Sequence, residues 1–306
     1  MSPTLGKFSR VVCALVLAQL AGCASFEFTK PMPVQAQPVA IKVSGEDLSA
    51  WSDMPLGVYR VPNSQVVISG HQTGQAGALL FGLIGVAIVH SANASAGATM
   101  IRDAEKQLNI NLNKPLQAEV DRLVAAGAFG PSVKAEPASA KVMLTPAIVL
   151  SYVSAQELRP YVVIRTSLAG ADGKPVWNTR YIASSGAARP LLGLDSWLEN
   201  DAAPLKASIQ RSLELATGTL ARDIAKPFPR VEDQFSVVEG HFPFVKPRLH
   251  VKGYPAAEDE STVTFIPKIG DVIVFAGVNV MDKSVIKYRP ALKDDVIFKI
   301  VEDAKK

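Results

Sequence analysis

Apolar and polar positions follow a helical period in two parts of the chain. Between residues 202 and 226, apolar residues recur every three or four positions, which places them on one face of a helix. A similar apolar face covers residues 116–124, with charges opposite it, and the stop signals Gly127 and Gly130 follow. We therefore predict two amphipathic helices, the longer of which ends before Pro227 because proline cannot continue a helix.

Three runs between these helices are rich in β-branched and aromatic residues and read as strands. They cover residues 141–154, 157–170 and 174–185. The pair Asp172-Gly173 separates the second run from the third and is a strong hairpin signal. Helix, three strands and helix in this order predict an α+β fold, in which helices cover an antiparallel sheet.

Short β-rich runs dominate the chain beyond residue 230. Gly, Pro and Asp clusters separate them at intervals of about eight to twelve residues, a spacing typical of small sandwiches and barrels. We predict an α+β domain over residues 41–230, followed by a small C-terminal all-β domain over residues 231–306.

The N-terminus has the layout of an export signal. Lys7 and Arg10 precede an apolar run of ten residues, Val11–Leu20, which is half of the roughly 20 residues that a membrane span needs. We therefore interpret residues 1–22 as a signal peptide rather than an anchor helix. An apolar segment of this length that is followed by small residues is typical of a leader that is removed.

The four residues Leu20-Ala21-Gly22-Cys23 match the bacterial lipobox, and in this respect the chain resembles bacterial lipoproteins. The resemblance implies that Cys23 receives the lipid and becomes the first residue of the mature chain. Ala24 and Ser25 follow it, where Asp often retains such proteins at the inner membrane, so we expect the periplasmic face of the outer membrane. The alternative is an ordinary secretory leader with an incidental cysteine.

Removing the leader changes what charge and cysteine content imply. The chain carries 32 basic and 28 acidic residues, and without Lys7 and Arg10 the basic count falls to 30, a net charge of +2. This balance lacks the excess of positive charge that is typical of a protein that binds nucleic acid. The other cysteine, Cys13, lies in the leader, so the mature chain has no pair for an intramolecular disulfide and no cysteine-based metal site or nucleophile.

Two segments near the start of the mature chain have unusual composition. Residues 23–40 include three prolines and little periodicity, which predicts an extended tether that lets the body stand off the membrane. Residues 74–101 carry no charge, and Gly77, Gly82 and Gly85 lie in their apolar core. Such glycines allow close packing, so the segment is a buried helix, a membrane-contacting or oligomerising helix, or a short membrane span.

No motif for catalysis or metal binding stands out. The four histidines have no metal-ligand spacing, and no nucleophile elbow or phosphate-binding loop is present. Asp172 fits the hairpin turn better than a catalytic role. Trp177 alternates within a predicted strand and is assigned to the core, whereas Trp197 lies in an apolar loop and is the better candidate for a partner contact. We expect neither enzyme activity nor a cofactor.

In element order, residues 112–226 resemble the small modules of periplasmic lipoproteins, such as the auxiliary lipoproteins of ABC transporters and the CsgG-like and LpoB-like assembly lipoproteins. The resemblance implies a lipid-anchored, non-enzymatic component that binds another envelope protein. One alternative is a lipoprotein that oligomerises through residues 74–101 to assist transport or secretion. Another is an envelope hydrolase with a dispersed active site.

Overall fold

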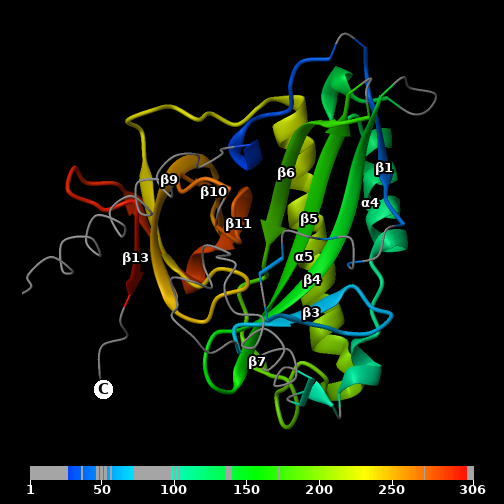
Figure 1. Ribbon diagram of the computed structural model, residues 1–306, viewed down its shortest axis with the longest axis vertical. Coiled ribbons are helices and arrows are strands. Elements are labelled where there is room, and N and C mark those ends of the chain that lie inside the picture. Colours follow the sequence, from blue (N-terminus) through cyan, green and yellow to red (C-terminus); the bar gives the residue numbers. More distant parts are fainter. Residues whose placement is uncertain are drawn as a thin grey trace, which may run out of the picture.

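The computed structural model describes residues 27–301, apart from 36, 46–47, 49–50, 52–53, 56, 72–97, 100, 103, 135–139, 171–172 and 272. Figure 1 labels its main elements. The strands are β1 Ala40–Val43, β2 Tyr59–Arg60, β3 Val66–Ser69, β4 Lys141–Tyr152, β5 Glu157–Ala169, β6 Pro175–Ala183, β7 Arg189–Pro190, β8 Ser236–Gly240, β9 Arg248–Glu258, β10 Thr262–Pro267, β11 Val278–Asp282, β12 Lys287–Pro290 and β13 Phe298–Val301. The helices are α4 Asn113–Ala125 and α5 Glu199–Ala225, with short 3-10 turns η1 Glu27–Thr29, η3 Glu105–Leu108, η4 Gly130–Ser132 and η5 Lys283–Val285.

The thirteen strands of the described part form one mixed sheet. Its main path is β12-β8-β9-β10-β11-β6-β5-β4-β3-β2, and β1, β7 and β13 pair with β4, β5 and β9. Strands β4, β5 and β6 form the predicted antiparallel meander. However, β1 and β3 both run parallel to β4, and β11 runs parallel to β6.

The predicted fold class, an antiparallel sheet covered by helices and followed by a small all-β domain, is therefore wrong. The sheet is mixed, and the C-terminal strands continue it through β11 instead of forming a sheet of their own. Pairing between β6 and β11 joins positions about a hundred residues apart in the chain. Local periodicity gives no signal for pairing at this distance, which is why the sequence predicts the strands but misplaces them.

Period-two alternation along the central strands separates two faces of the sheet. In β4, Ile148 and Leu150 join a hydrophobic cluster that includes both helices, whereas Val149 joins a second cluster. This second cluster includes Phe242 and Phe275, which stack with ring centroids 4.3 Å apart. Figure 1 shows the corresponding layers: α4 and α5 lie on one side of β4–β6, and the C-terminal strands lie on the other.

The two helices lie where the apolar spacing predicts them. The regular part of α5 follows three residues with positive φ, Asn200, Asp201 and Ala202, and the helix stops at Ala225. The turn between β5 and β6 uses Gly173 with φ +76°, a backbone conformation that glycine adopts without strain. Among the described residues, no helix is long and apolar enough to cross a membrane.

The described part of the predicted tether is attached to the body. The turn η1 begins it, and the carbonyls of Phe28 and Thr29 in this turn and of Lys30 after it accept hydrogen bonds from β6 and from the chain after α5. Further along, Val39 forms a parallel bridge with Val133, and Ala40 begins strand β1. Proline content therefore reports an irregular backbone in this segment, but these residues run along the protein surface rather than away from it.

A candidate peptide-binding groove beside strand β1

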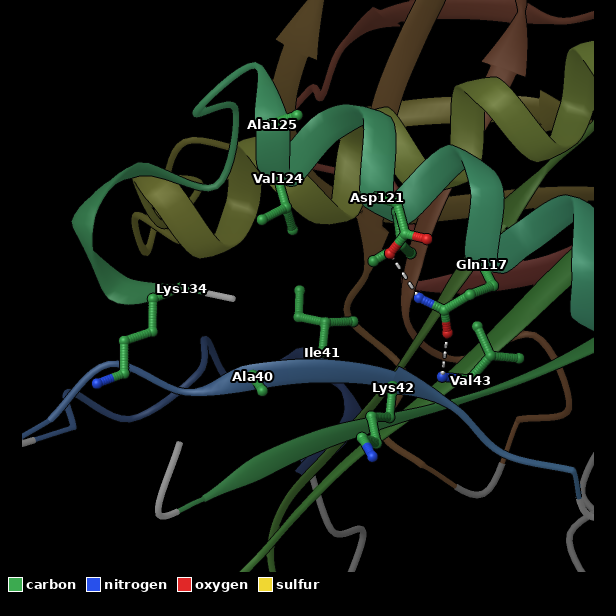
Figure 2. Close-up of a pocket in the computed structure, with 10 residues that line it drawn as sticks. Ala40, Ile41, Lys42, Val43, Gln117, Asp121, Val124, Ala125 and Lys134 are labelled. Carbon is green, nitrogen blue, oxygen red and sulfur yellow. Dashed lines mark hydrogen bonds between the residues drawn. The ribbon is translucent and has the colours of Figure 1, made fainter. Parts of the chain in front are cut away.

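An open groove lies between strand β1 and helix α4 (Figure 2). It has a volume of 730 Å³. The strand forms one wall, the helix forms the other, and Lys134 lies at one end. Its lining comprises Ala40, Ile41, Lys42, Val43, Gln117, Val120, Asp121, Val124, Ala125 and Lys134.

The hydrogen-bond pattern of β1 leaves part of its outer edge open. Ala40 and Ser44 donate their backbone N–H groups to β4 and its preceding residue, at 3.0 Å and 2.7 Å. Because alternate residues of a strand face opposite neighbours, the backbone groups of Ile41 and Val43 face away from β4. No described group accepts a hydrogen bond from the N–H of Ile41, so a donor and an acceptor of this residue face the groove.

Neighbouring residues bound this open stretch on both sides. At one end, Val39 donates to the carbonyl of Ser132 at 3.0 Å and accepts from the N–H of Lys134 at 3.0 Å. At the other end, the N–H of Val43 donates to Oε1 of Gln117 at 3.2 Å. The open edge of β1 is therefore centred on a single residue position.

The side chain of Gln117 takes the place of a strand backbone. Its carbonyl oxygen accepts from Val43, and its Nε2 donates to Oδ1 of Asp121 at 2.8 Å (Figure 2). An amide side chain offers the same donor and acceptor as a peptide group. An incoming strand can replace it at Val43 and pair with Ile41 at the same time.

The remaining lining suits an extended chain with an apolar side chain. Ile41 points toward α4, where Val120 is buried and Val124 is half-buried. Lys134 adds a positive charge at one end of the groove. In strand addition, backbone hydrogen bonds supply affinity and side-chain pockets supply specificity. This groove places one open backbone position beside apolar side chains.

The predicted site residues do not meet in this groove. Trp197 is only 1% exposed, and its indole N–H donates to the carbonyl of Leu158 at 2.7 Å, so its ring is in the core and offers no open face to a partner. Cys23, Gly77, Gly82 and Gly85 lie outside the described residues. Trp177 is buried, as predicted.

A polar cluster lies among the C-terminal strands, away from the groove. Buried His250 lies between two carboxylates, with Nδ1 3.1 Å from Glu239 and Nε2 3.8 Å from Asp295. Arg289 holds Asp295 in a two-pronged ion pair and, together with the backbone N–H of Leu292, keeps the pKa of that carboxyl well below its ordinary range. Within the described ranges, no group of three or more His, Cys, Asp or Glu side chains has the geometry to hold a metal ion. The cluster connects strands β8, β9 and β12 through side-chain contacts.

The groove was missed in the sequence because β1 falls in a weakly alternating region. The one available signal was the pair Gln117 and Asp121, four residues apart on a helix and therefore on one face. Comparison with known proteins adds no candidate: no family model matches the chain, and searches of curated proteins and of solved structures give no significant match.

Proposed function

We propose that this protein is a non-enzymatic lipoprotein of the bacterial envelope that binds an extended segment of another envelope protein in the β1–α4 groove. Acylation at Cys23 anchors it to the periplasmic face of the outer membrane. The proposed partners are the membrane, through this lipid, and a protein; nucleic acid is not among them. The lipobox sequence supports the anchor, and the open outer edge of β1 supports the binding role.

The open edge at Ile41 is the observation that carries the binding role. An unpaired strand edge is a template for another strand, and proteins commonly block such edges when they serve no purpose. Here Val133 and Gln117 block the two ends, and the position between them stays open toward a groove. A cavity of 730 Å³ beside it leaves room for the side chains of a short extended segment.

A site-specific photocrosslinker tests the proposal in the intact envelope. We expect p-benzoylphenylalanine at Ala125, which lines the groove, to capture a discrete partner band. The matched control carries the same group at Ala118, which is exposed on the same helix but does not line the groove. Equal capture from both positions, or none from Ala125, contradicts binding in the groove.

A second pair of variants isolates the backbone edge. Ile41→Pro removes the outward N–H but leaves the hydrogen bonds of Ala40 and Ser44 to β4, and proline is tolerated where a strand N–H faces away from its partner. Ile41→Ala truncates the same side chain and keeps the donor. We expect the crosslink at Ala125 to disappear in the proline variant and to persist in the alanine variant.

A further inference from the structure

Hydrogen bonds fix the first described residues of the chain to the body. The N–H of Phe28 donates to Oδ1 of Asp271 at 2.9 Å, and its carbonyl accepts from the hydroxyl of Thr179 at 2.6 Å. The indole N–H of Trp177 donates to the carbonyl of Lys30 at 3.0 Å. Strand β6 and the chain before β11 therefore hold this segment from two sides.

Two arginines add to this attachment. Arg230 donates to the carbonyl of Thr29 and forms an ion pair with buried Asp223, at 3.2 Å between Nη2 and Oδ2. The guanidinium of Arg180 lies 4.1 Å from the ring centroid of Phe28, within the range of a cation–π interaction. Each backbone carbonyl from Phe28 to Lys30 thus has a side-chain donor from the body.

This attachment limits how far the body can lie from a lipid at Cys23. Five residue steps separate Cys23 from Phe28. At about 3.3–3.6 Å per fully extended residue, they span at most about 18 Å. The polar layer on each side of a bilayer is itself roughly 5–7 Å thick, so little of this length remains to separate the body from the membrane.

We propose that the attached segment holds the η1 end of the body against the phospholipid surface that carries the anchor. The inference rests on the proposed acylation of Cys23. Three exposed large apolar side chains lie close to this segment or to its partners along the chain: Val34 follows it, and Val176 and Val231 are the sequence neighbours of Trp177 and Arg230, which bind it. They are 99%, 53% and 44% exposed. In Figure 1 the segment lies at the same end of the molecule as the start of β6 and the C-terminal end of α5.

Fluorescence quenching by labelled lipid tests this orientation. Because Cys23 is the one cysteine of the mature chain, a single reporter thiol can be placed at Val176 or Val231, and at Leu194 as the control. Leu194 is 83% exposed and precedes the opposite end of α5. Each acylated variant, carrying the fluorophore NBD, is reconstituted in phosphatidylethanolamine and phosphatidylglycerol vesicles with a headgroup nitroxide. We expect NBD at Val176 and Val231 to lose most of its emission, and NBD at Leu194 to keep it.

A longer linker between Cys23 and Phe28 provides the decisive comparison. Inserting about twenty Gly and Ser residues between Ser25 and Phe26 gives this linker a typical length of roughly 25 Å. We then expect the emission of NBD at Val176 to return. Quenching that is equal at Val176 and Leu194, or unchanged by the insertion, overturns the inference.

Co-sedimentation of the protein with vesicles separates this inference from the proposed anchor. The chain that retains Cys23 should sediment with the vesicles, and a Cys23→Ala variant should stay in the supernatant. Sedimentation without position-dependent quenching refutes the orientation alone. If the chain that retains Cys23 stays in the supernatant, the result contradicts the acylation of Cys23, and the orientation with it.

Discussion

Asp223 shows how one buried carboxylate near the end of α5 connects three parts of the chain. It is 2% exposed and accepts hydrogen bonds from the hydroxyl of Tyr181 at 2.9 Å and from the N–H of Phe228 at 2.8 Å. It also pairs with Arg230, which in turn holds the N-terminal segment. Burial, reinforced by the negative charge of Asp223, raises the pKa of Tyr181 well above its ordinary value of 10.0.

Removing this carboxylate should lower the free energy of unfolding more than removing one of its donors. We expect Asp223→Ala to lower the free energy of unfolding by about 3–5 kcal/mol, because it leaves the Arg230 charge partly buried without its partner. Tyr181→Phe removes one hydrogen bond to a charged group and should cost about 1.5–3 kcal/mol. Urea titration at neutral pH measures both, and equal losses would show that the ion pair contributes nothing beyond the tyrosine bond.

At the residue scale, the sequence predicts the burial of one tryptophan but not that of the other. Trp177 alternates within a strand, so its burial was predictable. Trp197 lies in a loop without periodicity, and it is buried because Leu158, 39 residues earlier, supplies the acceptor for its indole N–H. A contact of this kind depends on the fold of the whole sheet, which local sequence does not report.

At the element scale, the turn between β9 and β10 depends on a single carboxylate. Oδ1 of Asp259 accepts from the N–H groups of Ser261 at 2.8 Å and Thr262 at 2.7 Å, and Oδ2 accepts from the Thr262 hydroxyl at 2.7 Å. These bonds favour the charged form and lower the pKa of Asp259 from 3.8 to about 2. The turn should therefore stabilise the folded protein less in acid.

The Asp259→Asn variant tests this dependence on pH. Since the folded-state pKa lies below the unfolded value, the contribution of the carboxylate is fully present above about pH 4 and disappears as pH falls through about 2. Between these values, the native chain should lose about 1 kcal/mol or less relative to the variant, because the carboxylate is exposed to solvent. Urea midpoints of both proteins at several pH values measure it, and parallel curves would contradict the role of the charge.

The sequence predicts individual helices and strands better than it predicts which strands pair with each other. The period of apolar residues identified α4, α5 and the strands of the meander, because burial of one face imposes that period locally. It could not show that β1 and β3 run parallel to β4, since parallel partners are joined by long connections. The candidate groove lies beside β1, so a prediction of this site from the sequence would have required that parallel pairing.

At the scale of the whole molecule, the central strands are covered on both faces. The helices pack on one face, and side chains of the C-terminal region, such as Phe242 and Phe265, share a cluster with Tyr161 and Val163 of β5. Backbone pairing between Tyr181 and Val278 continues the sheet across the same boundary. Separating the two regions would expose this shared apolar surface to water.

We therefore expect the chain to unfold as one cooperative unit rather than in two stages. Native-state hydrogen exchange followed by mass spectrometry should give the slowest amides of β4 and of β9 the same opening free energy, within about 1 kcal/mol, because both elements open only when the shared cluster is lost. The turn at Asp259 serves as an internal control, since exposed turn amides exchange through local opening. If β9 and β10 exchange several kcal/mol more easily than β4, the C-terminal region opens while the rest stays folded, and the predicted boundary near residue 230 separates two independent folding units.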